Sequence, residues 1–226
     1  MTALAVTAAA AWGVDASGWI DVHDIVVVGV DRQDPAAIVA ASGIPNGPSM
    51  LRFSSSRAAR RVDALPLIDR AQVARVDPNT VRITVAERQP VLVAVAGRQQ
   101  VLIDRAGNII DEGVIDTLPT VMLSNAPPLV GGHVTDSAAL ANAFAVWHGL
   151  SGSLRSAVMR YVAQSADSLT LFLERGPRGE LEIRFGRAER IDEKVRAIGV
   201  VLADVGDTDV AVLDVRAPST PALVVP

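Results

Sequence analysis

The most regular pattern of hydrophobic and polar positions lies between Leu65 and Pro90. In its second half, apolar side chains alternate with polar or small ones; the apolar positions are Val81, Ile83 and Val85. This alternation predicts a half-buried strand, with one side on a core and the other toward solvent. Strand pairing should end or shift at Pro90, because proline cannot donate a ladder hydrogen bond. The sequence therefore predicts a boundary between two domains at residues 87–91.

Upstream of this boundary the pattern predicts a small α+β domain over residues 19–90. A dense β-branched run at residues 25–30 indicates a buried strand. Two helices should follow, one from Asp34-Pro35 to a stop at Gly43 and one capped by a serine among residues 54–56. Two extended runs around a turn at residues 77–79 complete the domain, with the helices on one face of a short sheet. The inward helix positions should be Ile38, Val39, Ala58, Val62 and Leu65.

Residues 91–226 are expected to form a mostly antiparallel β domain with flanking helices. Turn sequences at residues 105–108 and 175–179 each lie between two apolar extended runs, which predicts two hairpins. A last core strand is expected at residues 210–215, and prolines interrupt the tail that follows it.

Two helices should flank these strands. The first should be capped by Thr135 or Asp136 and end at Gly149; its inner side chains should be Leu140, Phe144 and Trp147. The second has apolar residues at helical spacing, at Ile191, Val195, Ile198 and Leu202. Residues 158–162 fit either a strand or a short helix.

Composition adds few constraints and suggests no chemistry. The 226 residues fit one large or two small domains, and half of them are hydrophobic, which is enough for a real core. The net charge of −4 argues against a nucleic-acid-binding protein, which usually has a strongly basic face. There is no cysteine, so disulfides and thiol chemistry are excluded.

No catalytic or metal-binding motif is present. The histidines are scattered at His23, His133 and His148, and the chain has no GxSxG, HExxH, Walker or GxGxxG sequence. Asp104 and Gly107 lack the acidic residues at alternate positions that a calcium loop needs. We therefore expect a protein that is not an enzyme and has no cofactor, metal ion or small-molecule substrate.

Two further segments each have two interpretations. Arg57, Arg60 and Arg61 form one basic patch on the second helix. This patch is either an ordinary solvated face or a contact for anionic lipid headgroups or an acidic partner. Residues 1–18 are apolar and uncharged up to Asp15, but shorter than the about 20 residues of a membrane-spanning helix. They are either the outer half of a truncated membrane anchor, with Trp12 at the interface, or an Ala-rich leader.

The same residues carry a family resemblance. Leu65-Pro66, Ala71-x-Val73-x-Arg75 and Pro78-x-Thr80-Val81-x-Ile83-x-Val85-x-Glu87-Arg88-x-Pro90 together resemble the end of the POTRA domain in the FtsQ/DivIB family of bacterial cell-division proteins. The family often has an aromatic residue before the first of these prolines, where this chain has Asp77. Further along, Leu102-Ile103-Asp104-x-x-Gly107 resembles the first hairpin of the family's β domain, and Asp214-Val215-Arg216 its closing strand.

The resemblance implies a non-enzymatic scaffold of the division machinery that links early and late components during septum assembly. Such proteins have one membrane helix, with a POTRA domain and a β domain outside the cytoplasm, and they bind the coiled-coil proteins FtsB and FtsL. A location in the cell membrane at the division septum is therefore expected. The alternatives are a POTRA-type assembly or translocation factor, which would need a barrel or several repeats, and a periplasmic accessory to a hydrolase, which would need a polar pocket.

The expected partner site is the end of the chain, residues 210–224. The strand at 210–215 could lie at a sheet edge, where unpaired N–H and C=O groups accept a further strand. It could also lie inside the sheet, with a frayed tail after it. Arg216 could bond an acidic partner, and apolar tail residues could anchor it. The candidate partner-binding residues are Asp214, Val215, Arg216, Ser219, Ala222, Leu223 and Val224.

Overall fold

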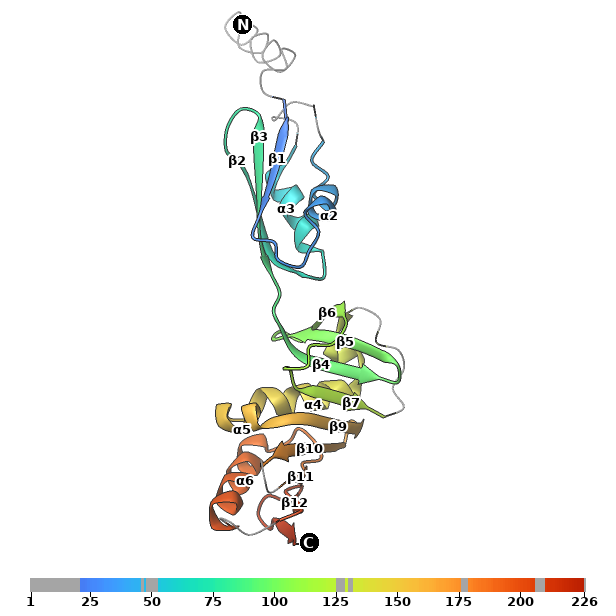
Figure 1. Ribbon diagram of the computed structural model, residues 1–226, viewed down its shortest axis with the longest axis vertical. Coiled ribbons are helices and arrows are strands. Elements are labelled where there is room, and N and C mark those ends of the chain that lie inside the picture. The colour runs from blue at the N-terminus through green and yellow to red at the C-terminus, as the bar shows by residue number, and fades with distance from the viewer. Residues whose placement is uncertain are drawn as a thin grey trace, which may run out of the picture. The chain divides into compact units, whose positions relative to one another are not determined.

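The computed structural model describes residues 21–45, 47, 53–124, 129, 132–175, 179–205 and 210–225. These residues belong to two compact units, the first ending at Arg88 and the second beginning at Gln89 (Figure 1). The predicted membrane-proximal segment 1–18 and the expected domain start near Trp19 lie outside the described residues. Among the residues described, no helix is long and apolar enough to cross a membrane.

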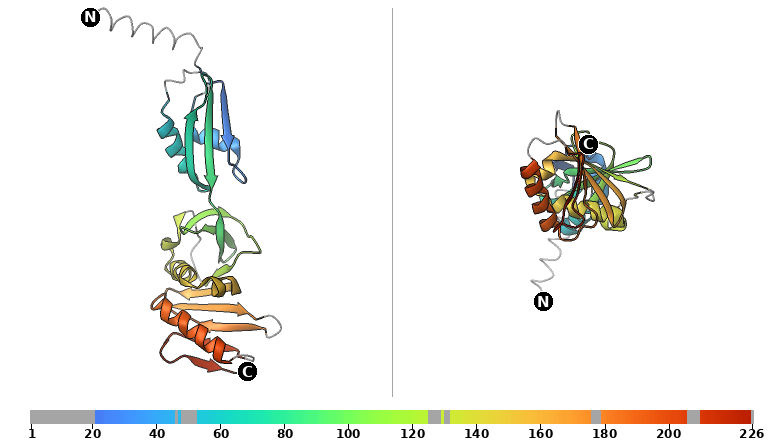
Figure 2. Two further views of the ribbon diagram at one scale, coloured as in Figure 1. Left: turned by 90° about the vertical axis from the view of Figure 1, so that its left-hand side faces the viewer. Right: turned by 90° about the horizontal axis from the view of Figure 1, so that it is seen from below.

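The first unit has the predicted order strand, helix, helix, strand, strand. Its elements are β1 (Asp24–Val28), α2 (Pro35–Ser42), α3 (Ser55–Asp63), β2 (Ile68–Arg75) and β3 (Thr80–Glu87). The sheet order is β1-β3-β2, with β1 parallel and β2 antiparallel to the central β3. Both helices lie on one face of this sheet (Figures 1 and 2), which confirms the predicted α+β arrangement.

The core of the first unit lies where the alternation places it. Val81 and Ile83 are fully buried and Val85 nearly so, while the intervening side chains of β3 face away from the helices. Ile38, Ala58 and Val62 pack on these strands from the helices; Val39 and Leu65 are only half-buried.

The predicted helix boundaries of this unit also hold. Asp34 caps α2 by accepting from the Ala36 N–H, and Ser54 caps α3 by accepting from the Arg57 N–H. Gly43 ends α2 with a φ of 61°, a left-handed conformation that glycine adopts without steric cost. Gly29 follows β1 with a φ of 90° and ends the strand.

The second unit is built on a ten-stranded sheet with helices on one face (Figures 1 and 2). Its strands are β4 (Pro90–Ala96), β5 (Gln99–Asp104), β6 (Asn108–Glu112), β7 (Thr120–Leu123), β8 (Gly132–His133), β9 (Val158–Ser165), β10 (Ser168–Glu174), β11 (Glu180–Arg184), β12 (Val212–Asp214) and β13 (Ala222–Val224). Its helices are the 3-10 turn η1 (Val134–Asp136), α4 (Ala138–Gly149), α5 (Gly152–Ala157) and α6 (Ile191–Val205).

The strand order of this sheet is β13-β12-β11-β10-β9-β7-β4-β5-β6-β8. Neighbouring strands are antiparallel except for the pairs β4–β7, β7–β9 and β11–β12, which are parallel. The predicted mostly antiparallel domain with flanking helices is therefore confirmed. Both predicted hairpins are present, as β5–β6 and β10–β11.

Three local expectations need correction or completion. The helix that was expected to be capped by Thr135 or Asp136 is capped by Ser137, because those two residues belong to η1. Residues 158–162 form a strand, β9, preceded by the short helix α5. The tail, for which fraying was one of two alternatives, forms the strand β13.

Two buried polar side chains hold the loop after β11 in place. Asn142 on α4 donates from Nδ2 to the Gly186 carbonyl at 3.0 Å and accepts from the Ala188 N–H at 2.6 Å. Lys194 on α6 donates from Nζ to the carbonyls of Phe185 and Arg187 at 2.9 and 2.8 Å. Burial lowers the pKa of Lys194. This loop lies beside the last strands of the sheet. The hydrogen bonds of Asn142 and Lys194, called the clamp below, therefore position the candidate site.

Candidate partner-binding edge

The outer strand at one end of the large sheet is β13. It pairs with β12 in antiparallel register, with Leu213 opposite Leu223, and β12 pairs on its other side with β11. The strand expected at residues 210–215 is thus inside the sheet, and β13 occupies the edge. In the part of the chain that the structure describes, no strand pairs with the outer side of β13, so this side is open to a further strand.

The side chains of this edge are unusually exposed for apolar residues. Leu223, Val224 and Val225 are 42%, 53% and 57% exposed. Pro218 and Pro221 lie in the turn between β12 and β13, so every residue of β13 itself keeps its N–H group. The turn is closed by a hydrogen bond from the Thr220 N–H to the Ala217 carbonyl at 3.1 Å. The edge therefore combines backbone donors with apolar side chains.

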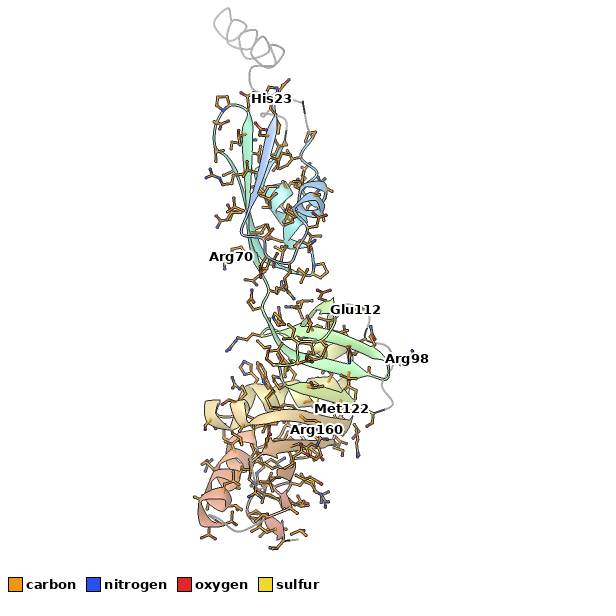
Figure 3. The ribbon with its side chains drawn as sticks, in the orientation of Figure 1. His23, Arg70, Arg98, Glu112, Met122 and Arg160 are labelled. Carbon is orange, nitrogen blue, oxygen red and sulfur yellow. The ribbon has the colours of Figure 1, made fainter. Side chains whose placement is uncertain are left out.

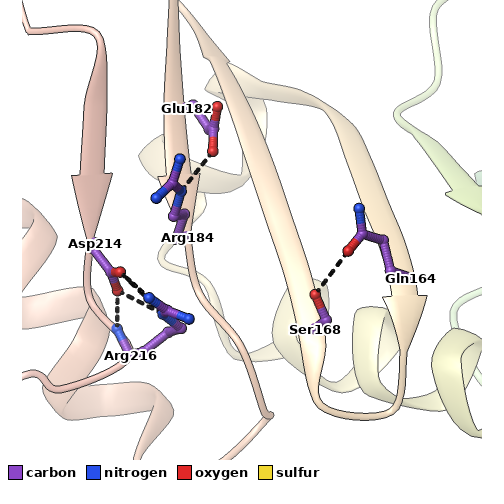
Figure 4. Close-up of polar contacts among 6 residues, drawn as sticks. All are labelled: Gln164, Ser168, Glu182, Arg184, Asp214 and Arg216. Atoms are coloured by element: carbon purple, nitrogen blue, oxygen red, sulfur yellow. Dashed lines mark hydrogen bonds and ion pairs between the residues drawn. The ribbon is translucent and has the colours of Figure 1, made fainter. Parts of the chain in front are cut away.

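Asp214 and Arg216 form an ion pair where β12 ends (Figure 4). Arg216 donates from Nε to both carboxylate oxygens at 3.0 Å each, and its backbone N–H donates to Oδ1 at 3.0 Å. These hydrogen bonds lower the pKa of Asp214 and raise the pKa of Arg216. The contacts use Nε and Nη2; among the described residues Nη1 makes no hydrogen bond. Arg216 thus has donors left for another carboxylate.

A polar cavity of about 410 Å³ lies next to this ion pair. Arg184 lines it and donates from Nε to Glu182 at 2.8 Å, and across the cavity Ser168 donates to Gln164 at 3.3 Å (Figure 4). Gly186 lines the wall with a φ of 73°, and a Cβ added there would lie 3.1 Å from Arg216 Cγ. Glycine therefore leaves room for the stem of Arg216 at this wall.

An apolar groove of about 420 Å³ lies on the other side of the β12–β13 turn, against α6. Val200, which is 69% exposed, lines it together with Val201, and the turn contributes Pro218, Ser219 and Pro221. The edge strand therefore lies near both a polar cavity and an apolar groove.

The face of the sheet that the helices leave open continues from this edge. Arg160 on β9 stacks on the Phe172 ring, with 3.6 Å between the guanidinium carbon and the ring centroid, and forms an ion pair with Glu180. Met122, on the neighbouring strand β7, is 43% exposed on the same face (Figure 3). The open face therefore carries both apolar and charged side chains, and Arg160 and Glu180 on it form an ion pair.

The structure brings most of the predicted site residues together. Asp214 and Arg216 form the ion pair, Ser219 lines the apolar groove, and Ala222, Leu223 and Val224 make up β13. Val215 is fully buried, so its side chain packs in the core and holds the strand in place. Sequence reasoning missed Arg184 and Val200. The alternation in β11 marks Arg184 as solvent-facing, but only the parallel β11–β12 pairing places it opposite Asp214.

The described residues include no group of three or more histidine, aspartate and glutamate side chains that could hold a metal ion. His133 has a structural role: its Nδ1 accepts from the Thr135 N–H at 3.3 Å, and its Nε2 lies 2.8 Å from the Ala106 carbonyl oxygen. Asp104 accepts from the N–H groups of Ala106 and Asn108 and so closes the β5–β6 turn. The hydrogen bonds of His133 and Asp104 therefore stabilise the local fold.

Comparison with known proteins identifies the architecture. Residues 21–88 match the family described as "POTRA domain, FtsQ-type". The chain is also similar to the cell division protein FtsQ of Mycobacteroides abscessus, with 29% identity over 211 residues that cover 90% of this chain and 61% of that protein. The chain therefore contains an FtsQ-type POTRA domain and is similar to FtsQ proteins along most of its length. The resemblance found in the sequence is thereby confirmed.

Other FtsQ proteins show the same extent of similarity. The FtsQ of Mycobacterium leprae is 27% identical over 205 residues, which cover 90% of this chain and 56% of that protein. The FtsQ of Chloroflexus aurantiacus is 28% identical over 200 residues, which cover 86% of this chain and 70% of that protein. The chain thus spans 61% and 56% of the M. abscessus and M. leprae proteins. The first unit is an FtsQ-type POTRA domain, and the likeness to FtsQ continues through the second unit.

Proposed function

We propose that this protein is a non-enzymatic scaffold of bacterial cell division that links early and late division proteins during septum assembly. The FtsQ-type POTRA domain and the similarity to FtsQ proteins support the cell-division role. The observation that carries the proposal is the open side of β13, an edge strand with exposed apolar side chains at the end of a ten-stranded sheet. An open edge with exposed apolar side chains suits a protein that works by assembling others.

The proposed partners are coiled-coil division proteins of the FtsB and FtsL type, which add an extended segment to β13. Strand addition gains affinity from main-chain hydrogen bonds and specificity from alternate side chains. On its open side β13 offers the N–H and C=O groups of Leu223, because those of Ala222 and Val224 face β12, and the side chains of Leu223 and Val224 can contact apolar side chains of the incoming strand.

Arg216 adds the charge specificity of the proposed interface. Its free Nη1 donors can bind a carboxylate of the partner while Nε and Nη2 stay on Asp214. The arginine is then shared between two carboxylates, so the partner does not have to displace Asp214. This favours a partner segment with an acidic residue near its added strand.

The proposed location is the cell membrane at the division septum, with both folded units outside the cytoplasm and an anchor in or before residues 1–18. The similarity to FtsQ proteins supports it. A fluorescent fusion that accumulates at mid-cell in dividing cells would support the proposal, and an even distribution around the envelope would contradict it.

The binding site is tested by pull-down with the extracytoplasmic segments of the FtsB- and FtsL-type proteins of the same organism. The intact chain is compared with a chain truncated after Arg216, which lacks β13, and with Arg216→Glu, which reverses the charge. Arg98→Glu, on the turn after β4, is a matched control for charge reversal far from β13 in the sheet order. Lost binding in the first two variants with retained folding supports the site. Unchanged binding in both would move the search to the POTRA domain.

A further inference from the structure

A further hollow lies in the POTRA domain, between the end of α2 and the start of α3, and the charged side chains that line it are positive. Its volume is about 260 Å³, and its charged side chains are Arg57 and Arg61 of α3. We propose that this hollow, the α3 pocket, binds a phosphate group, either free or as part of a lipid headgroup. The proposal is independent of strand addition at β13.

The geometry places both guanidinium groups at one opening. Arg57 and Arg61 are four residues apart, so they lie on the same side of α3. Arg61 reaches across to α2, where Nη1 donates to the Ser42 carbonyl at 3.5 Å. A Cβ added to Gly43 would lie 2.2 Å from this nitrogen, so the glycine that ends α2 also lets the guanidinium group lie against the helix end.

These charges are not balanced by a carboxylate in the described lining. None of the described residues that line the pocket is acidic. Among the described residues Arg57, Arg60 and Arg61 form no ion pair, whereas six other arginines do so; these are Arg88, Arg160, Arg184, Arg187, Arg190 and Arg216. The sequence between residues 44 and 53 contains no aspartate or glutamate either. The positive charges of the pocket therefore repel one another until an anion enters.

Phosphate fits this arrangement better than a carboxylate does. A phosphate monoester carries about −1.5 to −2 charges at neutral pH and three acceptor oxygens, enough to meet two guanidinium groups. Each guanidinium presents five donors in a planar fork that can bond two oxygens at once. A single carboxylate offers one charge and two oxygens, which one arginine alone can use.

The test is a titration of inorganic phosphate into the 226-residue chain at constant ionic strength, followed by the amide NMR signals of Gly43, Ser54 and Arg57. We expect a saturable shift, with an affinity about tenfold or more weaker in Arg57→Gln and in Arg61→Gln, as the loss of a charge-assisted bond implies. Arg60→Gln is the matched control: it removes the same charge from the same helix but does not line the pocket. Its affinity should stay within about twofold.

A second arm separates the two sources of phosphate. The same variants are sedimented with vesicles of phosphatidic acid, whose headgroup is a phosphate monoester, or of phosphatidylcholine. Selective loss of phosphatidic acid binding in Arg57→Gln and Arg61→Gln supports the pocket and assigns it to a lipid headgroup. Equal vesicle binding with a positive titration supports the pocket and assigns it to free phosphate. The absence of both effects, or an equal loss in Arg60→Gln, would overturn the proposal. Thermal melts of each variant verify folding. Because all three arginines are exposed, every variant should melt at nearly the same temperature as the unchanged chain.

Discussion

Ile83→Asp should unfold the POTRA domain. Ile83 is fully buried on the central strand of the small sheet, between Val27 of β1 and Val73 of β2. Its removal from water stabilises the fold by about 1.5–3 kcal/mol, and a buried carboxylate without a partner costs several kcal/mol more. A domain of residues 21–88 has a stability of roughly 3–10 kcal/mol at the usual value per residue. The two losses together are comparable with that whole stability.

The matched control is Arg82→Asp on the same strand. Arg82 is exposed and points away from the helices, so its replacement should cost no more than about 0.5 kcal/mol. Hydrogen exchange read by mass spectrometry separates the two units: Ile83→Asp should remove the protection of residues 21–88 and leave that of the second unit unchanged. Because burial raises the pKa of the new carboxyl group, the folded state binds the proton more tightly, and stability should recover as pH falls. Equal damage from both substitutions would refute the register of β3.

Three further outcomes are expected. Changing Arg57, Arg60 and Arg61 together to Gln should leave the melting temperature nearly unchanged in phosphate-free buffer, because all three are exposed and form no ion pair among the described residues; a large loss would reveal buried pairing. Lys194→Met should destabilise the second unit by about 1–3 kcal/mol in denaturant titrations, because two buried carbonyls lose their donor; an unchanged midpoint would contradict the clamp. The Asp214–Arg216 pair lowers the pKa of Asp214, so Asp214→Asn should cost stability above the unfolded pKa of about 3.9 and nothing below the folded pKa; a pH-independent difference between the two proteins would contradict this.

Local chemistry explains why so much of the POTRA domain could be predicted. The alternation of Val81, Ile83 and Val85, the Asp34 cap and the Gly43 stop each act within a few residues of chain, and the structure reproduces them. The same applies to the hairpin around the Asp104 turn, where one carboxylate accepts two backbone N–H groups. Short-range signals of this kind depend only on neighbouring residues, so a single sequence suffices to find them.

The candidate site was less predictable because it depends on pairing between distant segments. The three residues of β13 are too few to show a period, and the prolines before them suggest a loop. β12 joins β11 by a parallel crossover through α6, and it lies inside the sheet because β13 pairs with its other side; no local pattern predicts either pairing. The cap at Ser137 was misplaced for a related reason, since Thr135 and Asp136 are equally good capping residues and only η1 takes them out of the helix.

The central claim is that β13 receives a partner strand on its open side. The most direct test is amide hydrogen exchange of residues 222–225 with and without the extracytoplasmic segment of the FtsB-type protein. The claim predicts that N–H groups on the outer side of β13 become protected on binding, and that Leu223→Pro, which removes one donor, weakens binding more than Leu223→Ala does. Tight binding with no change in the exchange of these amides would contradict it.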